Sequence, residues 1–166
     1  RARFDSLADP RSVVRAAAAR GLTHLAITDH DRIEGALVGR DAAPAGLTVI
    51  VGEEVRTSGG DLIALFLERP IAPGLSPAEA IAAVRDQGGL VGVPHPFDRL
   101  RGSLGRARAL AALAPLVDWV ETHNARVLGG FLGPLGGPVR RVAQGVPAAE
   151  RQRVLADAAS GRAAVV

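Results

Sequence analysis

Hydrophobic and polar positions along the first 127 residues follow two patterns in turn. Alanine-rich stretches without interruption predict helices, and short runs of β-branched residues between glycines and polar residues predict buried strands. Strands that alternate with helices are typical of parallel βα units, so we expect an α/β fold with parallel strands. The predicted strands span residues 23–28, 47–51, 61–67, 90–93 and 117–121, and the predicted helices span 13–20, 33–41, 77–87 and 107–113.

Two of the predicted helices carry recognisable boundary signals. Asp9 followed by Pro10 fits an N-cap with proline at the first helical position, and Gly21 fits the C-terminal end. The segment Ser76-Pro77-Ala78-Glu79 fits a capping box, in which the serine and glutamate side chains each accept the other's backbone N–H.

Composition excludes several classes of protein. The chain has 166 residues, of which 48% are hydrophobic and 22% charged, so it can form one domain with a core. It has no cysteine, which excludes disulfides, thiolate metal sites and a cysteine nucleophile. A net charge of +3 does not favour binding to nucleic acid or membranes. No apolar run approaches the roughly 18 residues of a membrane span, and we expect a cytoplasmic protein.

The charge and composition change near residue 128. Residues 1–127 hold equal numbers of arginines and acidic residues, so the whole net charge of +3 lies in residues 128–166. This second part opens with the Gly/Pro-rich stretch 128–138, and a helix is predicted only at 148–159. We therefore expect a domain at 1–127 and a divergent tail, which could be a linker, a loop or a frameshifted reading.

Polar side chains follow four of the predicted strands. In parallel α/β folds the chemistry lies at the carboxyl ends of the strands, so these side chains are expected to meet at one edge. Carboxylates and imidazoles without thiolates suit Zn, Mn or Fe sites with open positions for water or phosphate. The residues concerned are Asp29 and His30, Glu53 and Glu54, His95, and the group Glu121, His123 and Asn124.

Four segments together resemble the polymerase and histidinol phosphatase (PHP) family. They are GLTHLAITDHDRIEGAL, VIVGEEV, QGGLVGVPHPFDR and VETHNAR, and they contain a TDH-x-x-x-x-G motif, a G-x-E motif and an HP motif in this order. The resemblance covers about residues 4–126. It implies part of a distorted (β/α)7 barrel, two or three divalent metal ions (Mn, Zn or Fe) and hydrolysis of phosphoesters.

The resemblance also implies roles for individual residues. Asp29 would orient a metal ligand without binding the metal itself. Arg99 and Asn124 would contact the substrate phosphate, Arg99 through a bidentate contact. Glu54 matches a glutamate that bridges two metals. The implied metal ligands are Asp5, His30, Glu54, Asp61 and His95.

Simpler interpretations remain open for several of these residues. Asp61 follows Ser58-Gly59-Gly60 and fits a turn residue as well as a ligand. Asp5 could lie in a disordered terminus, and Arg99 could be solvated. Glu53, beside Glu54, is interpreted as a solvated acid at a strand end.

The chain departs from the family pattern in two places. It lacks the H-x-H of the family's first strand and the Asp-x-His of a late strand. These elements supply one metal site and complete another, so we expect an incomplete copy of a longer parent, and a poor enzyme as it stands.

Two functions are compatible with these residues. For the intact form, the resemblance implies a metal-dependent phosphatase that hydrolyses a small phosphate monoester or a nucleotide through metal-activated hydroxide. The alternative is an inactive fragment that acts as a metal- or partner-binding module. Nucleic acid is not indicated as a partner, because residues 1–127 carry no net charge and few aromatic residues for base stacking.

Overall fold

The computed structural model describes residues 8–96, 111–121 and 163–165. These residues form a mixed α/β structure, and most of the predicted strands and helices are confirmed with small shifts of their ends. The elements are α1 (Pro10–Ala19), β1 (His24–Ile27), α2 (Glu34–Asp41), β2 (Thr48–Thr57), β3 (Gly60–Leu65), α3 (Pro77–Arg85), β4 (Leu90–Val93), β5 (Trp119–Val120) and β6 (Ala163–Val165). The predicted tail helix at 148–159 and most of the helix at 107–113 lie outside the described residues.

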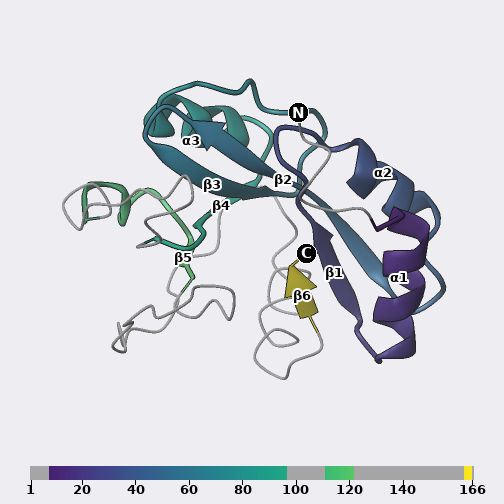
Figure 1. The fold of residues 1–166 in the computed structure, drawn as a ribbon. Coiled ribbons are helices and arrows are strands. Elements are labelled where there is room, and N and C mark those ends of the chain that lie inside the picture. Colours follow the sequence, from purple (N-terminus) through teal and green to yellow (C-terminus); the bar gives the residue numbers. More distant parts are fainter. Residues whose placement is uncertain (1–7, 97–110, 122–162, 166) are drawn as a thin grey trace.

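The described strands form one curled sheet in the order β5-β4-β3-β2-β1-β6 (Figure 1). The pairs β1–β2, β1–β6 and β4–β5 are parallel. This curled sheet is consistent with part of the barrel that the family resemblance implies.

The expectation that all strands run parallel is wrong for β3, which is antiparallel to both β2 and β4. The reason is the connection between β2 and β3. Thr57 pairs with Gly60, so only Ser58 and Gly59 join the two strands. A parallel pair needs a crossover of a dozen or more residues, whereas a two-residue turn forces a hairpin.

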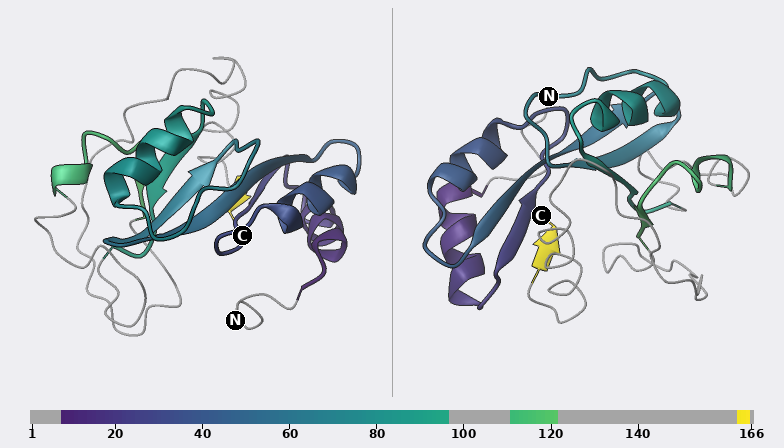
Figure 2. Two further views of the ribbon diagram at one scale, coloured as in Figure 1. Left: turned by 90° about the horizontal axis from the view of Figure 1, so that it is seen from above. Right: turned by 180° about the vertical axis from the view of Figure 1, so that it is seen from behind.

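The three helices lie on the outer, convex side of the curled sheet (Figures 1 and 2). They cover the main core, in which Val14 of α1, Ala36 of α2 and Val84 of α3 are packed with residues of β1 to β4. A smaller cluster of Ala26, Ile50, Ile63 and Leu65 is formed by alternate residues of the same strands. Since side chains alternate along a strand, this second cluster lies on the opposite face of the sheet.

The predicted helix caps are confirmed. Asp9 accepts a hydrogen bond from the backbone N–H of Ser12, which stabilises the start of α1 by about 1 kcal/mol. Ser76 and Glu79 form the complete capping box at the start of α3. These local contacts fix where the two helices begin against the sheet.

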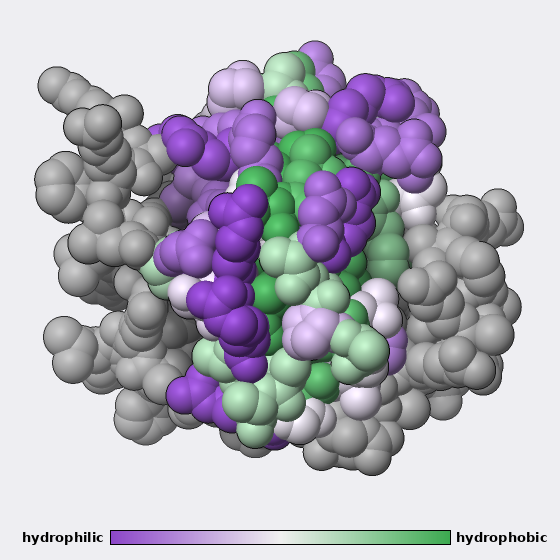
Figure 3. Space-filling model, turned by 90° about the vertical axis from the view of Figure 1, so that its right-hand side faces the viewer, coloured by the Kyte–Doolittle hydropathy of each residue, from purple (hydrophilic) through white to green (hydrophobic). Residues whose placement is uncertain are grey.

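The outer face over α1 and α2 is mixed in character (Figure 3). Hydrophilic and hydrophobic side chains are interspersed on it. Elsewhere, in the described part of the chain, Leu116 is the exposed large hydrophobic residue. Among the described residues, no helix combines the length and the apolar character needed to cross a membrane.

Candidate functional site

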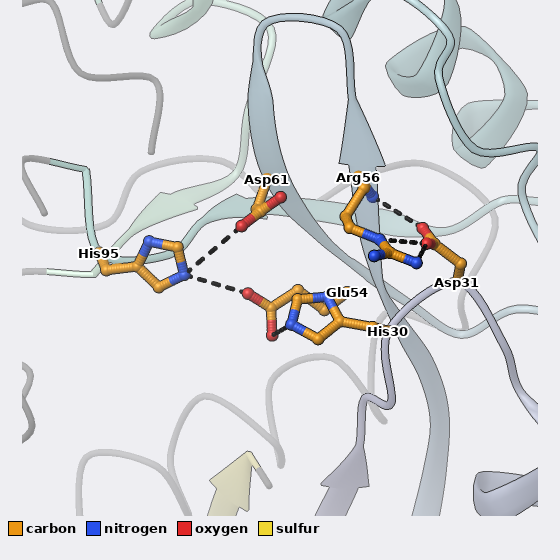
Figure 4. Close-up of polar contacts among 6 residues, drawn as sticks. All are labelled: His30, Asp31, Glu54, Arg56, Asp61 and His95. Carbon is orange, nitrogen blue, oxygen red and sulfur yellow. Dashed lines mark hydrogen bonds and ion pairs between the residues drawn. The ribbon is translucent and has the colours of Figure 1, made fainter. Parts of the chain in front are cut away.

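Three of the predicted metal ligands meet at one face of the sheet. Glu54 lies in β2, Asp61 lies in β3, and His95 lies just after β4. Glu54 is opposite Ile63, and Asp61 is two residues from Ile63, so both carboxylates point to the same face. Three neighbouring strands therefore deliver two acids and one imidazole to one place (Figure 4).

His95 is the centre of this group. Its Nε2 lies 3.0 Å from Glu54 Oε1 and 3.9 Å from Asp61 Oδ2. One ligand atom from each of the three residues lies within 4.8 Å of the others. His95 and Asp61 are buried and Glu54 is half-buried. A cation the size of Zn²⁺ or Mn²⁺ could contact all three side chains with small side-chain adjustments.

His30 lies on the other side of Glu54. An isolated parallel bridge joins the two residues, and the Nε2 of His30 lies 3.7 Å from Glu54 Oε2. The two oxygens of Glu54 therefore face two different imidazoles (Figure 4). A carboxylate in this position is able to serve two neighbouring cation sites.

In two of the sequence motifs, glycine is needed because a larger residue would clash with its neighbours. A Cβ on Gly52, in the G-x-E motif, would lie 2.8 Å from the carbonyl oxygen of Ala64 and 2.8 Å from Cγ2 of Thr28. A Cβ on Gly35, in the TDH-x-x-x-x-G motif, would overlap with Oδ2 of Asp29. Both glycines thus allow close approach beside the segments that carry Glu54 and His30.

Burial and mutual contact shift the protonation of the group. The hydrogen bond from His95 to Glu54 raises the pKa of His95, and burial opposes this effect. Burial, and then the negative charge of Glu54, raise the pKa of Asp61. The negative charge of Glu54 therefore disfavours the charged form of Asp61, and a bound cation would relieve that repulsion.

The backbone at His95 is in the left-handed region, with φ at +28°. Its N–H donates a hydrogen bond to Oε2 of Glu121 at 2.6 Å. Glu121 follows β5, and its own N–H donates to the carbonyl of Val93 at 2.8 Å. The sequence predicted Glu121 at the end of a strand but did not indicate a role for it.

An ion pair between Arg56 and Asp31 adjoins the site, and sequence reasoning missed it. Asp31 accepts the backbone N–H of Arg56 at 2.9 Å and also pairs with its guanidinium (Figure 4). Arg56 is opposite Asp61 in the β2–β3 register. Asp31 has a positive φ of 51°, which aspartate tolerates better than most residues. The pair thus ties the loop after β1 to β2.

The remaining predicted residues divide into two groups. The carboxylate of Asp29 lies against Gly35 in α2, next to the loop that carries His30. Its orienting role stays a prediction. Asp5, Arg99 and Asn124 lie outside the described residues, and their predicted roles are untested.

The interpretation of Glu53 as a solvated acid is wrong. Its side chain is fully buried, on the face of β2 opposite to Glu54. It accepts the backbone N–H of Ile71 at 2.8 Å, and burial raises its pKa to about 7. Because β2 continues to Thr57, the two glutamates lie inside a long strand, and alternation sends them to opposite faces.

The donor set fits a divalent metal. Two carboxylates and an imidazole are the ligands of metal sites that keep open positions for water or substrate. His95 Nε2 faces both carboxylates, and its Nδ1 has no hydrogen-bond partner among the described residues. Glu54, Asp61 and His95 are thus a candidate metal-binding group.

Sequence comparison connects the chain to archaeal relatives. No protein-family model matches it. The uncharacterized protein MJ1587 of Methanocaldococcus jannaschii is 38% identical over 102 residues, which cover 61% of this chain and 60% of that protein. The uncharacterized protein MJ0417 of the same organism is 47% identical over 85 residues, which cover 46% of this chain and 34% of that protein. The chain thus spans only part of the length of these relatives.

Two of the solved structures that resemble this chain are each 19% identical to it in sequence. One is a two-domain protein of Bacteroides vulgatus that contains a predicted PHP-like metal-dependent phosphoesterase, with a TM-score of 0.59 over 72% of this chain and 41% of that chain. The other is a proposed metal-dependent phosphoesterase of Bifidobacterium adolescentis, with a TM-score of 0.60 over 97% of this chain and 81% of that chain. The chain shares its fold with these proteins.

Proposed function

We propose that this chain forms part of a metal-dependent phosphoesterase, with Glu54, Asp61 and His95 as ligands of a divalent cation. The observation that carries the proposal is the convergence of these three side chains from three strands onto one face. The fold shared with two proteins described as metal-dependent phosphoesterases supports the same kind of chemistry.

The proposal assigns each residue a task. Glu54 would hold one cation with His95 and Asp61, and would direct its second oxygen to His30 at the adjoining position. A bound cation would lower the pKa of a coordinated water and so supply hydroxide near neutral pH for hydrolysis of the phosphoester, in which the P–O bond to the leaving alkoxide breaks. Burial of His95 and Asp61 keeps their side chains in fixed positions, which is the main contribution a protein makes to such a site.

Further residues enter the proposal from the family resemblance. Asp5 would be an additional ligand, Asp29 would orient His30, and Arg99 and Asn124 would hold the substrate phosphate. The substrate class is a small phosphate monoester or a nucleotide, and the metal is Mn, Zn or Fe. The alternative is an inactive fragment that acts as a metal- or partner-binding module; as a metal-binding module it would share the cation site and differ in activity.

Titration calorimetry with Mn²⁺, on chain stripped of metal by a chelator, tests the cation site. We expect Asp61→Asn and His95→Gln to weaken binding at least about tenfold, since each removes one of few protein ligands. Asp41→Asn is the matched control, because Asp41 is exposed at the end of α2 and, within the described part of the chain, its ion pair is with its neighbour Arg40.

Hydrolysis of p-nitrophenyl phosphate by the same proteins tests the reaction. Turnover that needs Mn²⁺ and disappears with chelator or in His95→Gln supports the phosphoesterase. Tight binding without turnover supports the non-catalytic module instead. Equal Mn²⁺ affinity for wild type and both ligand variants would eliminate the cation site, and with it both the phosphoesterase and the metal-binding module.

A further inference from the structure

The segment Pro94-His95-Pro96 has one backbone donor. Proline has no N–H, so within these three residues only His95 can donate a main-chain hydrogen bond. The left-handed backbone of His95, with φ at +28°, is unfavourable for a residue with a side chain. A conformation of this kind persists only where the surroundings hold it in place.

Glu121 stabilises this backbone conformation of His95. Its Oε2 accepts the N–H of His95 at 2.6 Å, which is short for a hydrogen bond to a carboxylate and typical of a strong one. Glu121 itself is fixed, because its N–H donates to the carbonyl of Val93 as a continuation of the parallel β4–β5 pairing. The carboxylate therefore connects the end of β5 to the turn that follows β4.

The left-handed backbone conformation of His95 determines where its imidazole points. In it, Nε2 of His95 lies 3.0 Å from Glu54 and 3.9 Å from Asp61. A different φ at His95 would rotate the side chain about the backbone and separate the three ligand atoms. The hydrogen bond of Glu121 reaches this group at the main chain of His95, and among the described residues the group of close ligand atoms does not include Glu121.

We propose that Glu121 is a positioning residue of the candidate metal centre: its carboxylate fixes the backbone of His95 so that the imidazole meets Glu54 and Asp61. The inference rests on the proposed function, because it assigns His95 as a metal ligand. It adds a residue that neither the motifs nor the cluster of ligand atoms identifies.

The first test measures Mn²⁺ affinity by titration calorimetry. Glu121→Met keeps the length of the side chain and removes the acceptor, and we expect it to weaken binding about tenfold or more, as loss of a residue that orients a ligand does. Glu121→Gln keeps an acceptor oxygen and should retain most of the affinity. Glu68→Met, at an exposed site, is the matched control and should change nothing.

A double variant separates positioning from direct ligation. In a His95→Ala background, Glu121→Met should cause no further loss, because its effect passes through His95. An additional loss in that background would mean that Glu121 binds the metal itself, and would overturn the inference. Unchanged affinity in Glu121→Met alone would overturn it as well.

The second test needs no metal. The three-bond coupling between the amide and α protons of His95 reports its φ, and the amide proton resonance reports the strength of its hydrogen bond. In Glu121→Met we expect the coupling to change and the resonance to move upfield, whereas Glu121→Gln should resemble wild type. If Glu121→Met does not fold, Glu121→Ala replaces it in both tests.

The two tests distinguish the two claims. If wild type binds no Mn²⁺, the proposed function fails, and the NMR result alone decides whether Glu121 controls the backbone of His95. An unchanged coupling and resonance in the loss variants would overturn the inference whatever the metal affinity.

Discussion

The buried carboxylate of Glu53 accepts the backbone N–H of Ile71 at 2.8 Å. This contact joins β2 to the segment between β3 and α3, on the face of the sheet opposite to Glu54. The second oxygen of Glu53 has no hydrogen-bond partner among the described residues. Burial, opposed by the Ile71 bond and reinforced by Asp31 and Glu34, raises the pKa of Glu53 to about 7.

This raised pKa predicts a stability that falls with pH. Below the ordinary pKa of 4.5, Glu53 is protonated in the folded and the unfolded chain and contributes no pH dependence. Between 4.5 and about 7 only the unfolded chain ionises, so the folded state loses stability as pH rises. A change of one pKa unit corresponds to about 1.4 kcal/mol, so the total loss is a few kcal/mol.

Glu53→Gln should remove this loss. Glutamine can still accept the Ile71 N–H but cannot ionise, so the variant should gain stability relative to wild type between pH 4.5 and about 7. Urea unfolding at several pH values, with chelator present, measures the difference. Parallel stability curves for the two proteins would contradict the prediction.

Glu79→Gln should show the opposite pH dependence. The hydrogen bonds from the Ser76 side chain and backbone lower the pKa of the exposed Glu79. Its ionised form therefore stabilises the fold above the ordinary pKa, and this contribution is lost as pH falls. The variant should be slightly less stable than wild type at neutral pH and equal to it in acid, which the same urea series would reveal.

The neighbouring residues Glu53 and Glu54 show how much of the candidate site could be predicted from the sequence. The positions of the strand ends predicted that Glu54 and His95 would share an edge, and the family resemblance added Asp61; the structure brings these three side chains together. The sequence pattern could not distinguish the environment of Glu53 from that of Glu54, because the difference depends on β2 extending through both residues to Thr57. The short apolar run at 47–51 showed only the first half of that strand.

The topology was predictable only in part. Apolar runs and caps located the elements, because these signals are local. The reversed direction of β3 depends on the two-residue connection between Thr57 and Gly60 and on pairing with β4, which is remote in sequence. The contact between Glu121 and His95 likewise depends on the β4–β5 register, which no local pattern determines.

Gly52→Ala should destabilise the fold and weaken the candidate metal centre. The added Cβ would meet the Ala64 carbonyl and the Thr28 methyl group, and overpacking of this kind costs about 1–3 kcal/mol. Thr28→Ser removes the methyl group, so the double variant should lose less than the sum of the two single changes. Thermal unfolding measures the cost, and strict additivity would show that the methyl group does not restrict position 52.

Asp118 lies directly before β5, the strand that Glu121 follows, and connects it to α3 and β4. Its Oδ2 lies 2.7 Å from Nη1 of Arg85 in α3 and 2.7 Å from the backbone N of Val91 in β4. Asp118→Ala would leave a half-buried guanidinium and a buried N–H without this acceptor, so we expect a loss of about 3 kcal/mol.

A double variant isolates the charge contact. In an Arg85→Met background, Asp118→Ala should cost less than in wild type, because the guanidinium is then absent. Urea unfolding of the four proteins gives the coupling energy. An equal cost in both backgrounds would assign the whole effect to the Val91 hydrogen bond.

Without metal, the stability of the protein should also respond to pH through His95. The hydrogen bond to Glu54 raises the pKa of His95 above its ordinary value of 6.5. Its contribution is therefore fully present below 6.5 and is lost as pH rises through the raised pKa. His95→Gln should lack this loss, so in chelator the stabilities of the two proteins should converge as pH rises.

A bound Mn²⁺ would take the place of the proton on His95, so adding Mn²⁺ should restore the stability of the wild type but not that of the variant at high pH. A constant difference between the two proteins across this range, in chelator, would show that the His95–Glu54 contact does not depend on the proton.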